Sequence, residues 1–398
     1  MKIRLLSAFT AAIIVCAPSF AQSRAVELTP ATDGDLRAAN LVAAPDMPLA
    51  NTSREAVSFT WPAVDAPASE RSEVHRAQSR SYGVTVSASD LAKGVALQLD
   101  APGAVVRVSG QRRGQLIDPD QLTIALASGR EMTARAATDQ LVLRDNMEAA
   151  GLNVAGQGLG IRFAAELGAG QVTLRYPQSR RDDSVRIDVF ERNSDKVLSV
   201  QSAADHFMQA REASVQIAWG EASRGASVDG YALAPDGQRH ELIFATNGTA
   251  RLASPARVAS QPGLWEWHVQ ATDTDGVRRD AKTVFALTAA VARLNNRASV
   301  VQQPDAVIIE LGAEVRSAGR YEARATLLGT NADGKLVPAL TSATADWLEP
   351  GSGALRLSFD TAAIKALGLS APFSLSNLSL LDQSRMGTLE RRQSAVTF

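Results

Sequence analysis

From residue 82 onward, hydrophobic and polar residues alternate in short runs, so that every second side chain is apolar. Turn-forming residues separate these runs about every 8–12 positions, a spacing typical of β-sandwiches and barrels. A period of two indicates strands with one buried face. The clearest runs lie at residues 84–86, 95–99, 106–108 and 122–126. The pattern therefore predicts an all-β chain of serial β-sandwich (immunoglobulin-like) domains.

A longer pattern recurs in the second half of the chain: a glycine, then an aromatic residue two positions later, then strict alternation. In residues 263–271 it places Trp265 and Trp267 on one face of a strand and His268 and Gln270 on the other, polar face. This predicts that both indoles lie in a core. Residues 319–327 repeat the plan, and Trp219 ends another run in core phase. Immunoglobulin-like domains close with such a strand, although their cysteine pair is missing here.

Asp-Gly and Asn-Gly pairs mark the predicted hairpin turns. Both central positions of a tight two-residue hairpin need a positive φ, which these residue types tolerate. The pairs stand at residues 229–230, 236–237, 247–248, 275–276 and 333–334.

Pattern and composition together divide the chain into five segments. They are a signal peptide, a leader, an N-terminal β-domain and two immunoglobulin-like β-sandwiches, at residues 1–21, 22–80, 81–181, 182–290 and 291–398. The leader is rich in Ala, Pro, Ser and Asp and is predicted to be extended or poorly ordered. Residues 56–61 are the exception, since they could add a strand to the next domain. The N-terminal β-domain is predicted to hold one short helix at residues 138–150.

The first residues have the features of a secretory signal. Lys2 and Arg4 precede the apolar residues 5–16, and small residues lead to Ala21, where cleavage would leave Gln22 first. The apolar run is shorter than the ~20 residues that span a bilayer, which disfavours a permanent anchor. We therefore expect a periplasmic or extracellular protein with no transmembrane segment after signal removal.

Composition changes this picture in three respects. With 45% hydrophobic and 21% charged residues, the 398-residue chain can bury several cores. Its 41 basic and 42 acidic residues give no electrostatic reason to bind nucleic acid. The single cysteine, Cys16, lies in the predicted signal, so the mature chain is predicted to be cysteine-free, without disulfides or thiolate zinc sites.

Searches for catalytic motifs assign no catalytic, cofactor-binding or metal-binding residue. The four histidines, His75, His206, His240 and His268, have no metal-ligand spacing, and no nucleophile elbow or phosphate loop is present. No cofactor is therefore predicted. Whether the chain is an enzyme stays open, and the missing motifs weigh against it.

Two features leave alternatives open. Asp273, Asp275 and Asp280 could contribute oxygen ligands to calcium, but the acids are few and an Asp-Gly hairpin is the favoured interpretation. Trp347 precedes a turn, so it is the tryptophan whose exposure matters most for a sugar-stacking role.

Several stretches together resemble a known family. The runs at residues 319–330, 345–351 and 357–360, with Asp382-Gln383, are similar to exported bacterial proteins of the domain-of-unknown-function family four-seven-eight-five. Parts of the N-terminal β-domain look similar too. The resemblance implies an N-terminal β-domain followed by immunoglobulin-like domains, and it implies no known activity or catalytic residues.

Two classes of function follow. The first is an exported, non-enzymatic binding or interaction protein of the cell envelope, with an unknown protein or glycan partner. The second is a secreted hydrolase or hydrolase accessory whose active site is not visible as a motif. Acidic residues gathered in one concave pocket would favour the second class, and a flat surface would favour the first.

Overall fold

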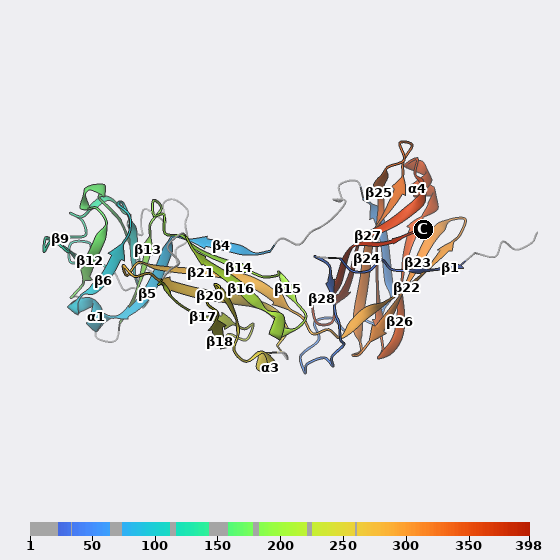
Figure 1. The fold of residues 1–398 in the computed structure, drawn as a ribbon, viewed down its shortest axis with the longest axis horizontal. Coiled ribbons are helices and arrows are strands. Elements are labelled where there is room, and N and C mark those ends of the chain that lie inside the picture. Colours follow the sequence, from blue (N-terminus) through green and yellow to red (C-terminus); the bar gives the residue numbers. More distant parts are fainter. Residues whose placement is uncertain are drawn as a thin grey trace, which may run out of the picture. The chain divides into compact units, whose positions relative to one another are not determined.

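The computed structural model describes residues 23–32, 34–63, 74–111, 117–142, 158–177, 183–220, 225–258 and 261–398. The predicted signal peptide lies outside them. The described residues are mostly strand, arranged in five sheets whose pairings are antiparallel except between β15 and β21 (Figure 1). The all-β prediction is confirmed. Among these residues, no helix has the length and apolar character that crossing a membrane requires.

The chain forms two compact units. Unit 1 takes in the described parts of residues 1–37, 49–70 and 292–398, and unit 2 those of residues 38–48 and 71–291. The predicted start of the C-terminal domain at residue 291 lies beside the point where the chain returns to unit 1.

Unit 1 is a sandwich of two sheets. The four-stranded sheet has the order β1 (Ser23–Glu27), β22 (Ala292–Gln302), β23 (Ala306–Val315) and β26 (Gly351–Asp360). The six-stranded sheet has the order β2 (Leu36–Arg37), β28 (Gly387–Thr397), β27 (Ser370–Asp382), β24 (Gly319–Thr330), β25 (Leu336–Leu348) and β3 (Val57–Pro62). Alternation along β24 buries Tyr321 and Leu327 in the core, as the recurring pattern predicts. A short helix, α4 (Thr361–Ala366), follows β26 and is capped by Asp360.

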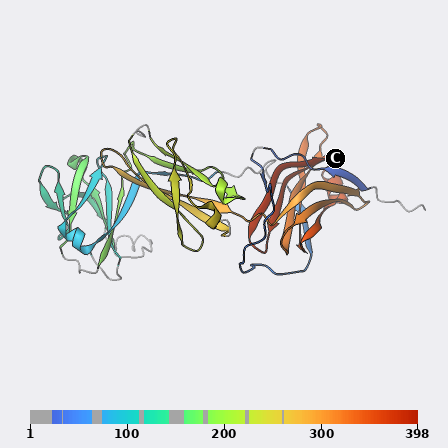
Figure 2. The same ribbon diagram turned by 60° about the horizontal axis from the view of Figure 1, so that its bottom comes forward.

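Three strands of unit 1 come from the segment predicted to be an extended or poorly ordered leader. β1, β2 and β3 each lie at the edge of a sheet, beside strands from the other end of the chain, as both views show (Figure 2). Of the two alternatives for the leader, extended or poorly ordered, these residues are extended and paired into sheets. The predicted partner of β3 is wrong, because β3 joins the last domain instead of the next one. Composition missed this because the pairing partners lie more than 200 residues away in sequence.

The first half of unit 2 is the N-terminal β-domain. One sheet has the order β10 (Thr138–Val142), β11 (Gly158–Phe163), β7 (Val105–Gly110), β13 (Ser184–Phe190) and β5 (Ser81–Ser87). The other has the order β6 (Val95–Leu99), β12 (Gly170–Arg175), β8 (Thr123–Leu126) and β9 (Glu131–Thr133). A 3-10 turn, η1 (Ala165–Leu167), links β11 to β12.

Two predictions for this domain are wrong. Residues 138–142 form strand β10, paired with β11, where a helix was predicted; the rest of that segment to residue 150 lies outside the described residues. The helix of this domain is α1 (Ala88–Lys93), whose first turn is capped by the Ser87 hydroxyl. The predicted boundary after residue 181 is also misplaced, because β13 pairs with β5 and β7 of the N-terminal domain.

The second β-domain of unit 2 is one nine-stranded sheet around a single core. Its order is β15 (His206–Phe207), β21 (Arg278–Leu287), β20 (Gly263–Thr272), β17 (Ser227–Leu233), β18 (Arg239–Phe244), β19 (Thr249–Leu252), β16 (Ser214–Trp219), β14 (Leu198–Ser202) and β4 (Arg76–Ser79). Short helical turns η2 (Ala210–Glu212) and α3 (Pro255–Val258) complete it. Trp219, Trp265 and Trp267 are buried, so the prediction that they are core residues is confirmed.

Four of the five predicted hairpin turns share one turn type, which differs from the predicted two-residue turn. At Gly237, Gly248, Gly276 and Gly334 only the glycine has a positive φ, and its N–H bonds the carbonyl three residues earlier. These are three-residue loops with a glycine bulge, not two-residue turns. Asp229 and Gly230 make no turn at all, because both lie inside β17.

Candidate functional site

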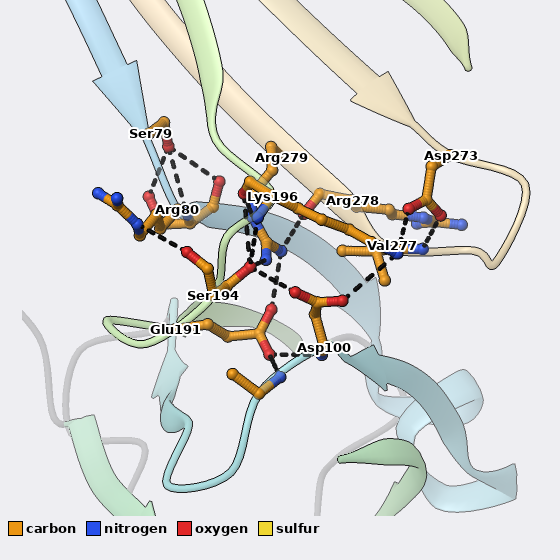
Figure 3. A network of polar contacts seen from close by, with 12 residues as sticks. Ser79, Arg80, Asp100, Glu191, Ser194, Lys196, Asp273, Val277, Arg278 and Arg279 are labelled. Carbon is orange, nitrogen blue, oxygen red and sulfur yellow. Dashed lines mark hydrogen bonds and ion pairs between the residues drawn. The ribbon is translucent and has the colours of Figure 1, made fainter. Parts of the chain in front are cut away.

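The two β-domains of unit 2 meet at a joint that buried polar groups hold together. The chain passes from β4 of the second domain to β5 of the first through Arg80, and it returns after β13 through residues 191–197. The loop 273–277 between β20 and β21 lies against this crossing (Figure 3). Arg80 donates from Nε to the carbonyl of Ser194 at 2.8 Å, which ties the two crossing segments to each other.

Arg279 is the centre of the joint. Its fully buried guanidinium lies 2.8 Å from Oε2 of Glu191, which is equally buried (Figure 3). Arg279 also donates to the Ser194 hydroxyl at 2.8 Å and to the Lys196 carbonyl at 3.0 Å. The other oxygen of Glu191 accepts from the N–H groups of Asp100 and Ala101. A buried ion pair is stable only when further hydrogen bonds offset the loss of its hydration. Because these hydrogen bonds are directional, they favour one geometry of the joint.

The Lys196 ammonium lies among three carboxylates, two of which belong to acids considered for calcium. Its ammonium lies 2.6 Å from Asp273, 2.9 Å from Asp275 and 3.3 Å from Asp100. Burial opposes the charge of Lys196, but hydrogen bonds with Asp273 and Asp275 outweigh it and raise its pKa. Burial of Asp273 is likewise outweighed by Lys196 and two backbone N–H groups, so its pKa is lowered.

The three acids considered for calcium are thus divided. Asp273 accepts from the N–H groups of Asp275 and Val277 and closes the hairpin, as the favoured interpretation predicted. Asp280 lies three residues beyond that turn, on β21, and contacts a different set of groups. No cluster of three or more metal-ligating side chains occurs in the part of the chain that the structure describes.

A groove of about 440 Å³ lies between the two β-domains of unit 2. On the second domain, two rows of side chains line it across neighbouring strands β17, β20 and β21. The acidic row consists of Asp229, Gln270 and Asp280, which the strand register places side by side. The stacked row consists of Tyr231, His268 and Lys282, which are likewise neighbours in the strand register. On each strand the residue of the stacked row lies two positions from the residue of the acidic row. On the N-terminal domain, Gly83 and Arg186 form the opposite side.

Asp280 is the most unusual group of the groove. Its Oδ2 accepts from the N–H of Gly83 at 2.8 Å, and Gln270 donates to Oδ1 at 3.4 Å. Burial raises the pKa of Asp280 above its ordinary value, although the Gly83 N–H and the charge of Arg186 oppose this shift. A carboxyl group with a raised pKa in a groove is a candidate for ligand contact.

The stacked row is held rigid by its own contacts. The rings of Tyr231 and His268 stack with centroids 4.7 Å apart, and the Arg239 guanidinium lies 4.4 Å from the Tyr231 ring. Glu266 contacts His268 at 2.7 Å and Lys282 at 3.4 Å. The hydrogen bond from His268 is the main cause that lowers the pKa of Glu266. These side chains present fixed polar edges to the groove.

Two glycines allow the close approaches that shape the groove. A Cβ at Gly83 would lie 1.8 Å from Nη2 of Arg186, and one at Gly230 would lie 2.3 Å from the carbonyl oxygen of His268. Arg186 can therefore lie across β5, where it pairs with Asp188 at 2.8 Å. The arrangement combines acids, an amide, an imidazole and cations, and it can bind a polar ligand by hydrogen bonds and charge.

The sequence pattern indicates only part of this site. It placed His268 and Gln270 on the polar face of their strand, but Asp229 was assigned to a turn, and Tyr231 and Arg186 were not singled out. The period of two could have put each residue on its face, but the register between strands, which assembles the rows, has no local signal. Trp347, whose exposure was open, is half-buried in unit 1; it donates to Glu349 and lies beneath Arg54.

Comparisons with known proteins show which fold and which family the chain shares. No curated protein matches it. A crystal structure of a DUF4785 family protein from Legionella pneumophila is similar, with 20% identity and a TM-score of 0.68, covering 91% of this chain and 98% of that one. This likeness shows the fold alone.

Two further structures share much less with the chain. A tetra-tandem repeat of a large adhesion protein has 11% identity and a TM-score of 0.20, covering 81% of this chain and 74% of that one. The C-terminal domain of the Streptococcus agalactiae AgI/II polypeptide BspA has 8% identity and a TM-score of 0.17, covering 86% and 100%. Scores this low support no inference.

Two family models cover most of the chain. The N-terminal domain of the "Domain of unknown function (DUF4785)" matches residues 48–191, and the C-terminal domain of the same family matches residues 288–398. The first match ends beside Glu191, where the chain leaves the N-terminal β-domain at the joint. The chain belongs to the DUF4785 family.

Proposed function

We propose that this protein is exported and acts, without catalysis, as a binding protein of the cell envelope. Its ligand, a protein or glycan component of the envelope, occupies the groove of unit 2. The observation that carries this proposal is the groove itself, whose two sides come from different domains. The buried pair of Arg279 and Glu191 fixes those domains next to it, so the site is formed before the ligand arrives. Preformed polar sites bind with little ordering cost.

A blocking substitution tests the proposal. Gln270 is exposed in the acidic row, so Gln270→Trp should fill the groove without disturbing the core. Gln171 on β12 is an equally exposed strand glutamine away from the groove, so Gln171→Trp is the matched control. Immobilised protein is incubated with solubilised envelope extract, and bound components are identified by mass spectrometry. A component retained by wild type and Gln171→Trp but lost from Gln270→Trp supports the groove. Equal retention by all three contradicts it.

One observation favours a hydrolase, the class for which acids gathered in a concave pocket were the expected sign. It stays the second candidate because the sequence has no catalytic motif beside these acids. Asp229 and Asp280 share a concave groove, and the raised pKa of Asp280 is what a general acid needs. The retained component distinguishes the two functions. If it is a binding ligand, its mass stays unchanged after long incubation with the protein. Cleavage by wild type, lost in Asp280→Asn, would favour the hydrolase.

A further inference from the structure

The charges of the groove are not balanced. On its two sides the cations already have partners, since Lys282 contacts Glu266 at 3.4 Å and Arg186 contacts Asp188 at 2.8 Å. The acidic row differs. Among the described residues, neither Asp229 nor Asp280 forms an ion pair, and Asp229 accepts only from the N–H of Gly230. The groove therefore has two carboxyl groups whose charge the protein does not compensate at contact distance.

Asp280 is also held in place for a ligand. The Gly83 N–H fixes Oδ2, whereas Oδ1 has only the long contact from Gln270 at 3.4 Å. Removing a carboxylate from water costs free energy unless a cation or strong donors replace the water. A positively charged group of the ligand that reaches Oδ1 would form the ion pair that the described residues do not give Asp280.

We propose that the groove binds an oligosaccharide through a free primary ammonium group that pairs with Asp280. This inference rests on the proposed function and deepens it. Neighbouring strands lie about 4.8 Å apart, so Asp280 on β21 and Asp229 on β17 are separated by two such spacings. A ligand that reaches both must be longer than one sugar ring. Asp229 accepts a hydroxyl or a second amino group of the next ring.

The remaining groups favour a sugar over a basic peptide. Between and beside the two acids, Gln270 and His268 offer hydrogen-bonding edges that ring hydroxyls can satisfy. Gln270 already donates to Asp280 and His268 Nε2 already contacts Glu266, so the Gln270 carbonyl oxygen and His268 Nδ1 are left for a ligand, and the methylene groups of a lysine side chain would satisfy neither. An amino sugar brings charge and hydroxyls together.

Matched probes test the inference. The glucosamine tetramer, its fully N-acetylated form and tetralysine are titrated calorimetrically at about pH 6, where primary amines carry a proton. We expect the glucosamine tetramer to bind at least about tenfold more tightly than the acetylated form, the effect of one charge-assisted contact. Asp280→Asn should reduce its affinity by about the same factor. Asp139→Asn, at an exposed acid of β10 outside the groove, should leave it unchanged.

Each other outcome overturns the inference in a distinguishable way. Tighter binding of tetralysine would assign the groove to basic peptides. Equal binding of both sugar tetramers, abolished by Gln270→Trp, would reject the ammonium contact while the proposed function stands. If no probe binds, the ammonium inference fails, and the envelope capture with Gln270→Trp decides the proposed function separately.

Discussion

Units 1 and 2 both use buried arginines to hold segments that are distant in sequence, but they support these contacts differently. In unit 1, Arg392 donates to the Thr29 carbonyl at 2.7 Å and Arg320 to the Ser53 carbonyl at 3.2 Å. The same N-terminal segment also adds strands to the sheets. In unit 2, Arg279 holds the joint between domains that share no sheet in the described residues.

This difference determines what each arrangement can do. In unit 1, strand pairing distributes the stability over many backbone hydrogen bonds, so the buried arginines contribute only part of what holds the N-terminal segment in place. The joint of unit 2 depends on a few directional charge contacts, and it leaves a groove beside them. The comparison therefore locates both the most sensitive position of the molecule and its candidate site in unit 2.

The largest expected effect comes from Arg279→Met. Removing the cation leaves Glu191 buried without its charge partner, which costs about 3–5 kcal/mol of unfolding free energy. Arg175 pairs with Glu131 at the surface of the same unit, so Arg175→Met should cost less than about 1 kcal/mol. Urea unfolding measures both, with amide exchange in β20 and β21 to locate the loss. Similar small effects would mean that the joint does not depend on this pair.

The next effect tests unit 1. Leu28, just after β1, is buried, and Leu28→Ala should cost about 2–3 kcal/mol because it leaves a cavity. Leu336→Ala, at an exposed leucine of β25, should cost less than about 0.5 kcal/mol. Amide exchange in β22 reports the change, since β1 pairs with that strand. An unaffected β22 would show that the N-terminal segment contributes little to the sandwich.

A smaller effect concerns Lys196. In Lys196→Ala the carboxylates of Asp100, Asp273 and Asp275 lose their shared cation, at a cost of about 1–2 kcal/mol. Calcium should leave the melting temperatures of both the variant and the wild type unchanged, because the described residues gather no group of three metal-ligating side chains. A rise in the wild type that Asp275→Asn abolishes would instead restore the calcium interpretation.

The smallest expected effect is a gain in stability when Asp280 is replaced by Asn. Because burial raises its pKa, the folded state binds the proton more tightly than the unfolded state does. Its contribution to stability is complete at low pH and is lost as pH rises through the raised pKa. Asp280→Asn should therefore be slightly more stable than wild type near neutral pH, because the amide has no charge that burial opposes. The gain should shrink towards about pH 4, near the ordinary pKa. Melting curves across pH measure it, and lower stability at neutral pH would contradict the assignment.

The sequence predicted which face of a strand is buried better than it predicted which strands pair with each other. Alternation correctly placed Trp265, Trp267 and Tyr321 in cores, because the period of two is a local property of a strand. It could not predict that β3 pairs with β25, since the leader composition suggests disorder and the partner is distant. The helix predicted at residue 138 failed for a similar reason: pairing with β11 overrides the local capping signal.

The candidate site shows the same limit. His268 and Gln270 were predicted on a polar face, yet nothing in one strand indicates that Asp229 and Asp280 flank Gln270 on either side. Lys196 was not foreseen as the partner of Asp273, because it comes from a crossing segment 77 residues earlier. Long-range contacts of this kind define the groove and the joint.

The central claim is that the groove of unit 2 holds a ligand from the envelope. Amide hydrogen exchange of the protein, with and without the component that it retains from envelope extract, tests this claim most directly. The account predicts added protection in β17, β20 and β21 and in β5 across the groove, and no such protection in Gln270→Trp. Protection confined to unit 1, or equal protection in Gln270→Trp, would contradict it.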